Sequence, residues 1–173
     1  NIRYDESVPV AEDWLLWYSI KNLVRFANIP EELYLCRRGE QNVTVKHGAA
    51  VSWERNGQLH ELFLKELGIE FSDYELKLHR FIMAQFSVAP TPQIVRDARM
   101  WMNKLMQHNR IVQQYPERVF EKLAEENWDK LFYRLTPYGF ETIMSYYKNS
   151  KNISASKIYY YLRYLIRSKT SRK

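Results

Sequence analysis

TPQIVRDARMWMNKL, residues 91–105, carries the clearest helix signal in the chain. Thr91 suits the N-cap position, because its hydroxyl can accept a hydrogen bond from an amide that the first helical turn leaves without a partner. Pro92 suits the first helical position, where the missing amide hydrogen costs nothing. One wide apolar stripe follows at helical spacing: Ile94, Val95, Ala98, Trp101, Met102 and Leu105. The stretch predicts an amphipathic helix that buries one face in a core.

Upstream of this stretch, two further helices are predicted. Ser72 and Glu75 have the spacing of a capping box, which predicts a helix that runs to about Phe86. Gly68 stands where the helix before it would end, since glycine accepts the left-handed backbone of a C-terminal cap.

Downstream, three more helices are predicted. Pro116 opens the first, and Thr136 followed by Pro137 repeats the cap-then-proline arrangement before the second. The last has apolar residues at i, i+3, i+4, i+7 and i+8: Ile158, Tyr161, Leu162, Leu165 and Ile166. We expect this stripe to dock on the body of the protein.

The first 55 residues are less regular. A helix is predicted between Val10 and Phe26. The β-branched residues 43–45 and the segment 49–53 then predict a small β-hairpin or irregular excursion within residues 33–55, closed by Asn56-Gly57.

The predicted fold class is therefore mainly α, a single compact multi-helix domain over residues 1–173, a length that suits one domain. Residues 1–55 form its N-terminal helix and irregular segment. Residues 56–153 form the helical core, and residues 154–173 form a basic C-terminal helix and tail.

Charge is distributed unevenly along the chain. The formal net charge is +6, but residues 1–133 hold 17 Lys and Arg against 19 Asp and Glu, a balance of −2. Residues 134–173 hold 9 against 1, a balance of +8. The C-terminal quarter is therefore either a solvated basic tail or a surface for an acidic partner.

The sequence offers little for catalysis. The four histidines lack the spacing of metal ligands, and with 5 glycines no phosphate-binding loop is recognisable. The single cysteine, Cys36, is more typical of a core residue than of a nucleophile. We expect no enzyme activity, no catalytic residue, no metal and no cofactor.

Two cationic surfaces are candidate binding sites. Arg37 and Arg38 could bind an acidic peptide bidentately, with Lys46 and Arg55 adding to the patch. The alternative is an exposed pair that keeps a sheet edge soluble.

The second candidate surface is the C-terminal helix. There, Lys157, Arg163, Arg167 and Lys169 alternate with tyrosines and could bind nucleic acid on or beside the exposed side. The alternative is a docked helix whose tyrosines cover the edge of the core while its long cations reach solvent.

Two stretches resemble the DotM/IcmP/TrbA family. FLKELG (63–68) followed by LKLHRFIMAQF (76–86) is similar to that family's F-x-x-Q-L-G and L-x-x-H pattern. LFYRLTPYG (131–139), preceded by Asp129, is similar to its D-R-x-L-W-Y-x-L-N-x-x-G stretch. The matching segments lie between residues 63 and 139, a span of about half the chain.

The resemblance implies a non-enzymatic adaptor of a type IVB secretion or IncI-type conjugation machine. Such a domain lies on the cytoplasmic face of the bacterial inner membrane, anchored through segments outside this chain. Its implied partners are other coupling-complex proteins and glutamate-rich signals on exported proteins, with Arg37 and Arg38 placed for the latter role. A nucleic-acid-binding regulator or replication accessory protein of a mobile element is the alternative function.

Overall fold

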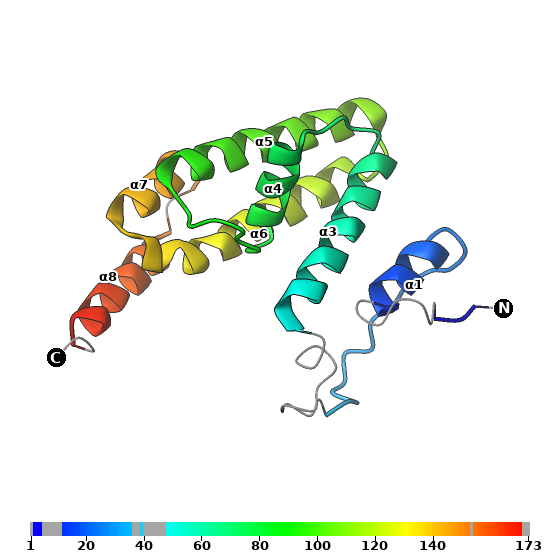
Figure 1. Ribbon diagram of the computed structural model, residues 1–173, viewed down its shortest axis with the longest axis horizontal. Helices are drawn as coiled ribbons and strands as arrows, with labels where there is room; N and C mark the ends of the chain where they lie inside the picture. Colours follow the sequence, from blue (N-terminus) through cyan, green and yellow to red (C-terminus); the bar gives the residue numbers. More distant parts are fainter. Residues whose placement is uncertain (1, 5–11, 36–38, 40–47, 153, 171–173) are drawn as a thin grey trace. The chain divides into compact units, whose positions relative to one another are not determined.

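The computed structural model describes residues 2–4, 12–35, 39, 48–152 and 154–170; for residues 48–56 and 169–170 it describes the backbone alone. Seven α-helices and one short 3-10 helix lie in these residues, and no strand does (Figure 1). They are α1 (Glu12–Ile20), α3 (Gly48–Glu66), α4 (Asp73–Ile82), α5 (Pro92–Val112), α6 (Glu117–Leu135), η1 (Thr136–Tyr138), α7 (Phe140–Lys148) and α8 (Ala155–Thr170). The predicted mainly α fold is confirmed.

The chain divides into two compact units, residues 1–63 and residues 64–173. In the first unit, the predicted strand at residues 49–53 is wrong, because these residues belong to α3. That helix also continues through Asn56 and Gly57, which do not break it. A helical glycine costs about 1 kcal/mol relative to alanine, a local penalty that a long helix can absorb. Residues 40–47 of the predicted excursion lie outside the described part of the chain.

Helix α5 organises the second unit, where it packs against α4, α6 and α7. Five of the six residues of its predicted stripe are buried: Val95, Ala98, Trp101, Met102 and Leu105. Large side chains from α6 and α7 complete the core, among them Trp128, Phe132 and Tyr146. Residues 91–105 therefore bury one face of α5 in a core, as predicted.

The predicted helix starts of α4 and α5 are confirmed. The Thr91 hydroxyl accepts a hydrogen bond from the Ile94 amide at 3.2 Å. Ser72 and Glu75 form both hydrogen bonds of a capping box. Helix α4 nevertheless ends at Ile82, earlier than predicted, because the chain turns left-handed at Ala84 (φ 58°).

The expectation that Thr136 caps α7 is wrong. Thr136 opens η1 instead, and its hydroxyl donates to the Tyr133 carbonyl at 3.0 Å. Helix α7 begins after Gly139, whose φ of 91° favours a residue without a side chain. Thr136 and Pro137 therefore begin a 3-10 turn that connects α6 to α7.

Candidate functional site

Helix α8 is held on the core by Lys157. This residue is buried, and its ammonium donates to Asp129 Oδ1 at 2.5 Å and to the Tyr146 hydroxyl at 2.9 Å. Burial lowers the pKa of Lys157, but the two hydrogen bonds outweigh burial, so that the pKa lies above its ordinary value. The prediction that Lys157 lies on or beside the exposed side is wrong: its charge is used inside the fold.

The docked face of α8 differs from the predicted stripe. Tyr161 is buried, and Leu165 packs against the core, as predicted. Ile158, Leu162 and Ile166 are instead exposed. Two rows of residues lie about 100° apart around the helix. The first row consists of positions 157, 161 and 165, and the second of positions 158, 162 and 166. Because Lys157 binds Asp129, α8 presents the first row to the core.

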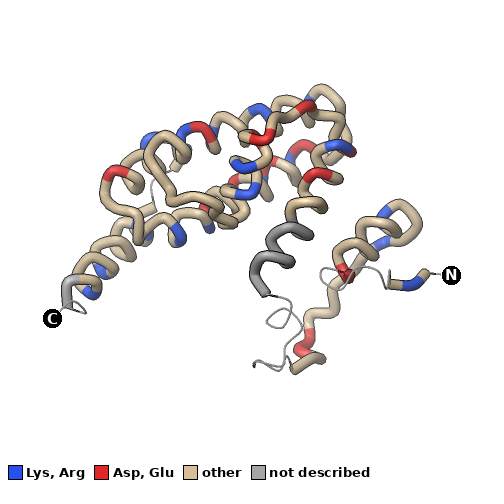
Figure 2. Tube along the Cα trace, in the orientation of Figure 1, with Lys and Arg blue, Asp and Glu red and all other residues tan. Residues whose placement is uncertain are grey.

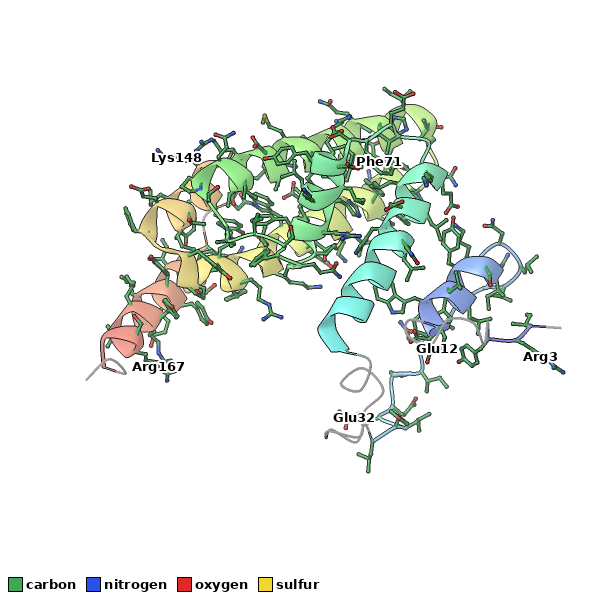
Figure 3. The ribbon with its side chains drawn as sticks, viewed as in Figure 1. Arg3, Glu12, Glu32, Phe71, Lys148 and Arg167 are labelled. Atoms are coloured by element: carbon green, nitrogen blue, oxygen red, sulfur yellow. The ribbon has the colours of Figure 1, made fainter. Side chains whose placement is uncertain are left out.

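A groove lies between α6 and α8, with a volume of about 310 Å³. We call it the tyrosine–arginine groove. Four tyrosines, two arginines and one serine line it: Tyr133, Ser156, Tyr159, Tyr160, Arg163, Tyr164 and Arg167. Six of the seven come from α8, and Tyr133 comes from the last turns of α6. Figure 3 shows Arg167 near the C-terminal end of α8.

Three of the four tyrosine rings of this groove are exposed but held in place, and the fourth, Tyr164, is partly buried against the core. Tyr159 is 61% exposed, and Tyr133 and Tyr160 are each 43% exposed. Tyr133 and Tyr160 meet edge to face, with ring centroids 4.8 Å apart and planes at 90°. The Arg163 guanidinium lies 5.7 Å from the centre of the Tyr159 ring. Contacts between rings and cations, more than burial, therefore set the positions of these side chains.

The charged side chains that line the groove are positive. Among the described residues, its lining holds two guanidinium groups and no carboxylate. Asp129 lies one turn before Tyr133 on α6, but its charge is paired with Lys157. No Asp or Glu occurs in the sequence after Glu141, and Figure 2 shows Lys and Arg but no Asp or Glu along α8 itself. The groove therefore favours anionic ligands.

Arg163 and Arg167 are the two predicted nucleic-acid residues that the structure brings together. Lys169 lies in the last turn of α8, where the structure describes the backbone alone. The predicted acidic-peptide residues are not placed: Arg37, Arg38 and Lys46 lie outside the described residues, and Arg55 is described by its backbone in α3. That site stays a prediction.

Sequence reasoning missed Tyr133 as a member of the site. The residue lies far upstream of α8, so only the folded chain brings it against Tyr160. The pattern of residues in α6 nevertheless indicated that Tyr133 could belong to a surface site. Phe132 and Leu135 belong to the buried face of α6, and Tyr133 falls outside that face as a large exposed aromatic.

Among the described residues, no group of three or more His, Cys, Asp or Glu is arranged to hold a metal ion. The same residues include no helix whose length and apolar character would let it cross a bilayer. Comparison with family models, curated proteins and solved structures finds no match to this chain.

Proposed function

We propose that this protein binds single-stranded nucleic acid through the tyrosine–arginine groove. The observation that carries the proposal is the grouping of four tyrosines and two arginines in one groove to which the described part of the chain contributes no carboxylate. Proteins that bind single strands combine aromatic platforms, on which bases stack, with cations that follow the phosphate backbone. Because every base has a π-face, such a site tolerates many sequences.

The exposed fractions argue against the simpler role of core packing. A tyrosine that only covers the edge of a core buries most of its ring. Tyr159 and Tyr160 remain about half exposed, whereas their neighbour Tyr161 is buried. The core role therefore falls to Tyr161, and the two neighbouring rings stay available to a ligand.

A salt titration tests this function. We expect a fluorescent oligo(dT) strand to bind at low salt, with log K falling linearly as log[salt] rises, because phosphate contacts release counterions. The double variant Arg163→Gln/Arg167→Gln removes two cations from the groove. It reduces the magnitude of the slope by about 1.4, at about 0.7 for each phosphate contact on a single strand.

The matched control is Arg118→Gln/Lys122→Gln, which removes the same charge from exposed positions near the start of α6. These positions lie roughly 20 Å along the helix from Tyr133. The control variant keeps the slope of the unmodified protein. An equal loss of slope in both variants would mean that net charge alone drives binding, and absence of binding at low salt would end the proposal.

The second candidate is the adaptor role that the family resemblance implies. We propose that the chain is a non-enzymatic component of a type IV secretion or conjugation machine that contacts coupling-complex proteins and acidic signals. This role is supported by the stretches that resemble the family, because they contribute six residues to one core: Leu64, Leu67, Leu78, Phe81, Leu131 and Phe132. Since these are packing residues, the support bears on the fold more than on a ligand site.

A peptide titration tests the adaptor role. A glutamate-rich peptide is expected to bind the unmodified chain and to bind Arg37→Glu/Arg38→Glu at least tenfold more weakly, because the variant places carboxylates against carboxylates. Far-UV circular dichroism checks that the variant keeps its helices. Equal affinity for both proteins would remove the arginine pair from this role.

A further inference from the structure

A second hollow lies on the other side of α8, between α8 and α7. It has a volume of about 360 Å³ and an entirely apolar lining. The lining residues are Phe140, Ile143, Met144, Tyr147, Ile158, Tyr161, Leu162 and Leu165. Phe140 is 64% exposed and Leu162 is 53% exposed, so the hollow is open to solvent. We call this hollow the α7–α8 groove.

The α7–α8 groove continues across α7. A neighbouring hollow of about 650 Å³ shares Phe140 and Met144 with it and reaches the first turns of α5. The shared residues form an apolar floor, and Arg96, Lys148 and Glu141 are the charged residues that line this extension. The combined surface is therefore elongated, apolar along its floor, and bordered by two cations and one carboxylate.

This shape matches a helix better than it matches a small molecule. An amphipathic helix inserts a row of apolar side chains at i, i+3, i+4 and i+7 into such a groove and leaves its polar flanks at the rims. The exposed row Ile158, Leu162 and Ile166 has the spacing of a helix surface that packs against another helix. The face of α8 that the core leaves uncovered is thus suited to a further helix.

Charge identifies the kind of helix. The charged residues that line the combined surface are Arg96, Lys148 and Glu141, a balance of +1. A symmetric pair of chains would bring this surface against its own copy, since a twofold interface uses the same patch on both partners. Repulsion between like charges therefore disfavours a second copy. Carboxylates along one side of a partner helix would instead be attracted to Arg96 and Lys148.

We propose that the α7–α8 groove binds an amphipathic helix of a partner protein, with an apolar row on the floor and acidic side chains at the cationic rim. This interface is separate from the tyrosine–arginine groove, which lies on the other side of α8. The two surfaces let the protein hold an anionic strand and a protein partner together.

The test uses a synthetic peptide of about 18 residues, or five helical turns, with leucine at i, i+3, i+4 and i+7 and glutamate on its flanks. Binding is measured by fluorescence anisotropy in the absence of nucleic acid. We expect Leu162→Glu to weaken binding at least tenfold, because the new carboxylate lies on the floor. The matched control is Leu123→Glu on α6, since Leu123 is also 53% exposed. This variant keeps the affinity of the unmodified chain.

Three outcomes would overturn the proposal. Equal binding of a peptide with lysine in place of every glutamate would remove the argument from charge. Concentration-dependent self-association that Leu162→Glu abolishes would assign the groove to a second copy of the chain. Binding to vesicles of anionic phospholipid that Leu162→Glu abolishes, with no peptide binding, would assign it to a lipid surface.

Discussion

Replacing Trp128 with alanine is expected to lower the free energy of unfolding by about 3–5 kcal/mol, the usual range for a buried aromatic. The Trp128 indole is 1% exposed and stacks on Tyr146, with ring centroids 5.2 Å apart. Its Nε1–H donates to the Ser150 hydroxyl at 2.8 Å, and the Arg99 guanidinium lies 5.3 Å from its ring. Truncation therefore removes apolar burial and leaves a cavity beside α7 as well.

Urea unfolding followed by circular dichroism measures this loss. The control is Leu123→Ala on the same helix, where the side chain is half exposed and the expected loss is below about 1 kcal/mol. A loss below 1 kcal/mol for Trp128→Ala would contradict the packing of α6 against α7.

Asp129→Ala is expected to lower the free energy of unfolding by about 3 kcal/mol, because it leaves the Lys157 ammonium buried without a counterion. The Lys157 side chain is 7% exposed, and after the change its ammonium keeps the Tyr146 hydroxyl as a partner. The expected loss is at the low end for a broken buried pair, since the Asp129 side chain is itself 65% exposed.

A second substitution separates charge burial from lost packing. In Asp129→Ala/Lys157→Met the buried charge is gone, and methionine fills most of the space of the lysine stem. We expect this double variant to recover at least 2 of the roughly 3 kcal/mol that Asp129→Ala costs, since apolar replacements of buried pairs are often neutral. A double variant no more stable than Asp129→Ala would mean that Lys157 holds α8 by some other means.

The parts of the fold that were predictable from the sequence are those set by local signals. Thr91 and Pro92 start α5 through contacts within its first turn, and the apolar stripe that marks its buried face lies in the same stretch of 15 residues. Ser72 and Glu75 likewise cap α4 through a three-residue spacing. Such signals do not depend on the rest of the fold, so they can be recognised before the fold is known.

The wrong prediction for the docked face of α8 and the missed residue Tyr133 concern positions where distant contacts decide. The spacing of the apolar residues in α8 allows two docked faces about 100° apart, and the choice depends on Asp129, which is 28 residues from Lys157 in the chain. Tyr133 reaches the candidate site through its contact with Tyr160, again across the α6–α8 connection. Periodicity within one helix carries no information on either pairing.

Tyrosine ring NMR tests most directly our proposal that bases stack on the four tyrosine rings of the α6–α8 surface. Oligo(dT) is added to protein with labelled tyrosine rings, and the changes in chemical shift of two sets of rings are compared. Tyr133, Tyr159, Tyr160 and Tyr164 line the groove, whereas Tyr74 and Tyr138 are exposed or half exposed and lie outside its lining. We predict ring-current shifts in the first set and none in the second. Shifts confined to Tyr74 and Tyr138, or no shift in any ring at saturating strand, would contradict the account.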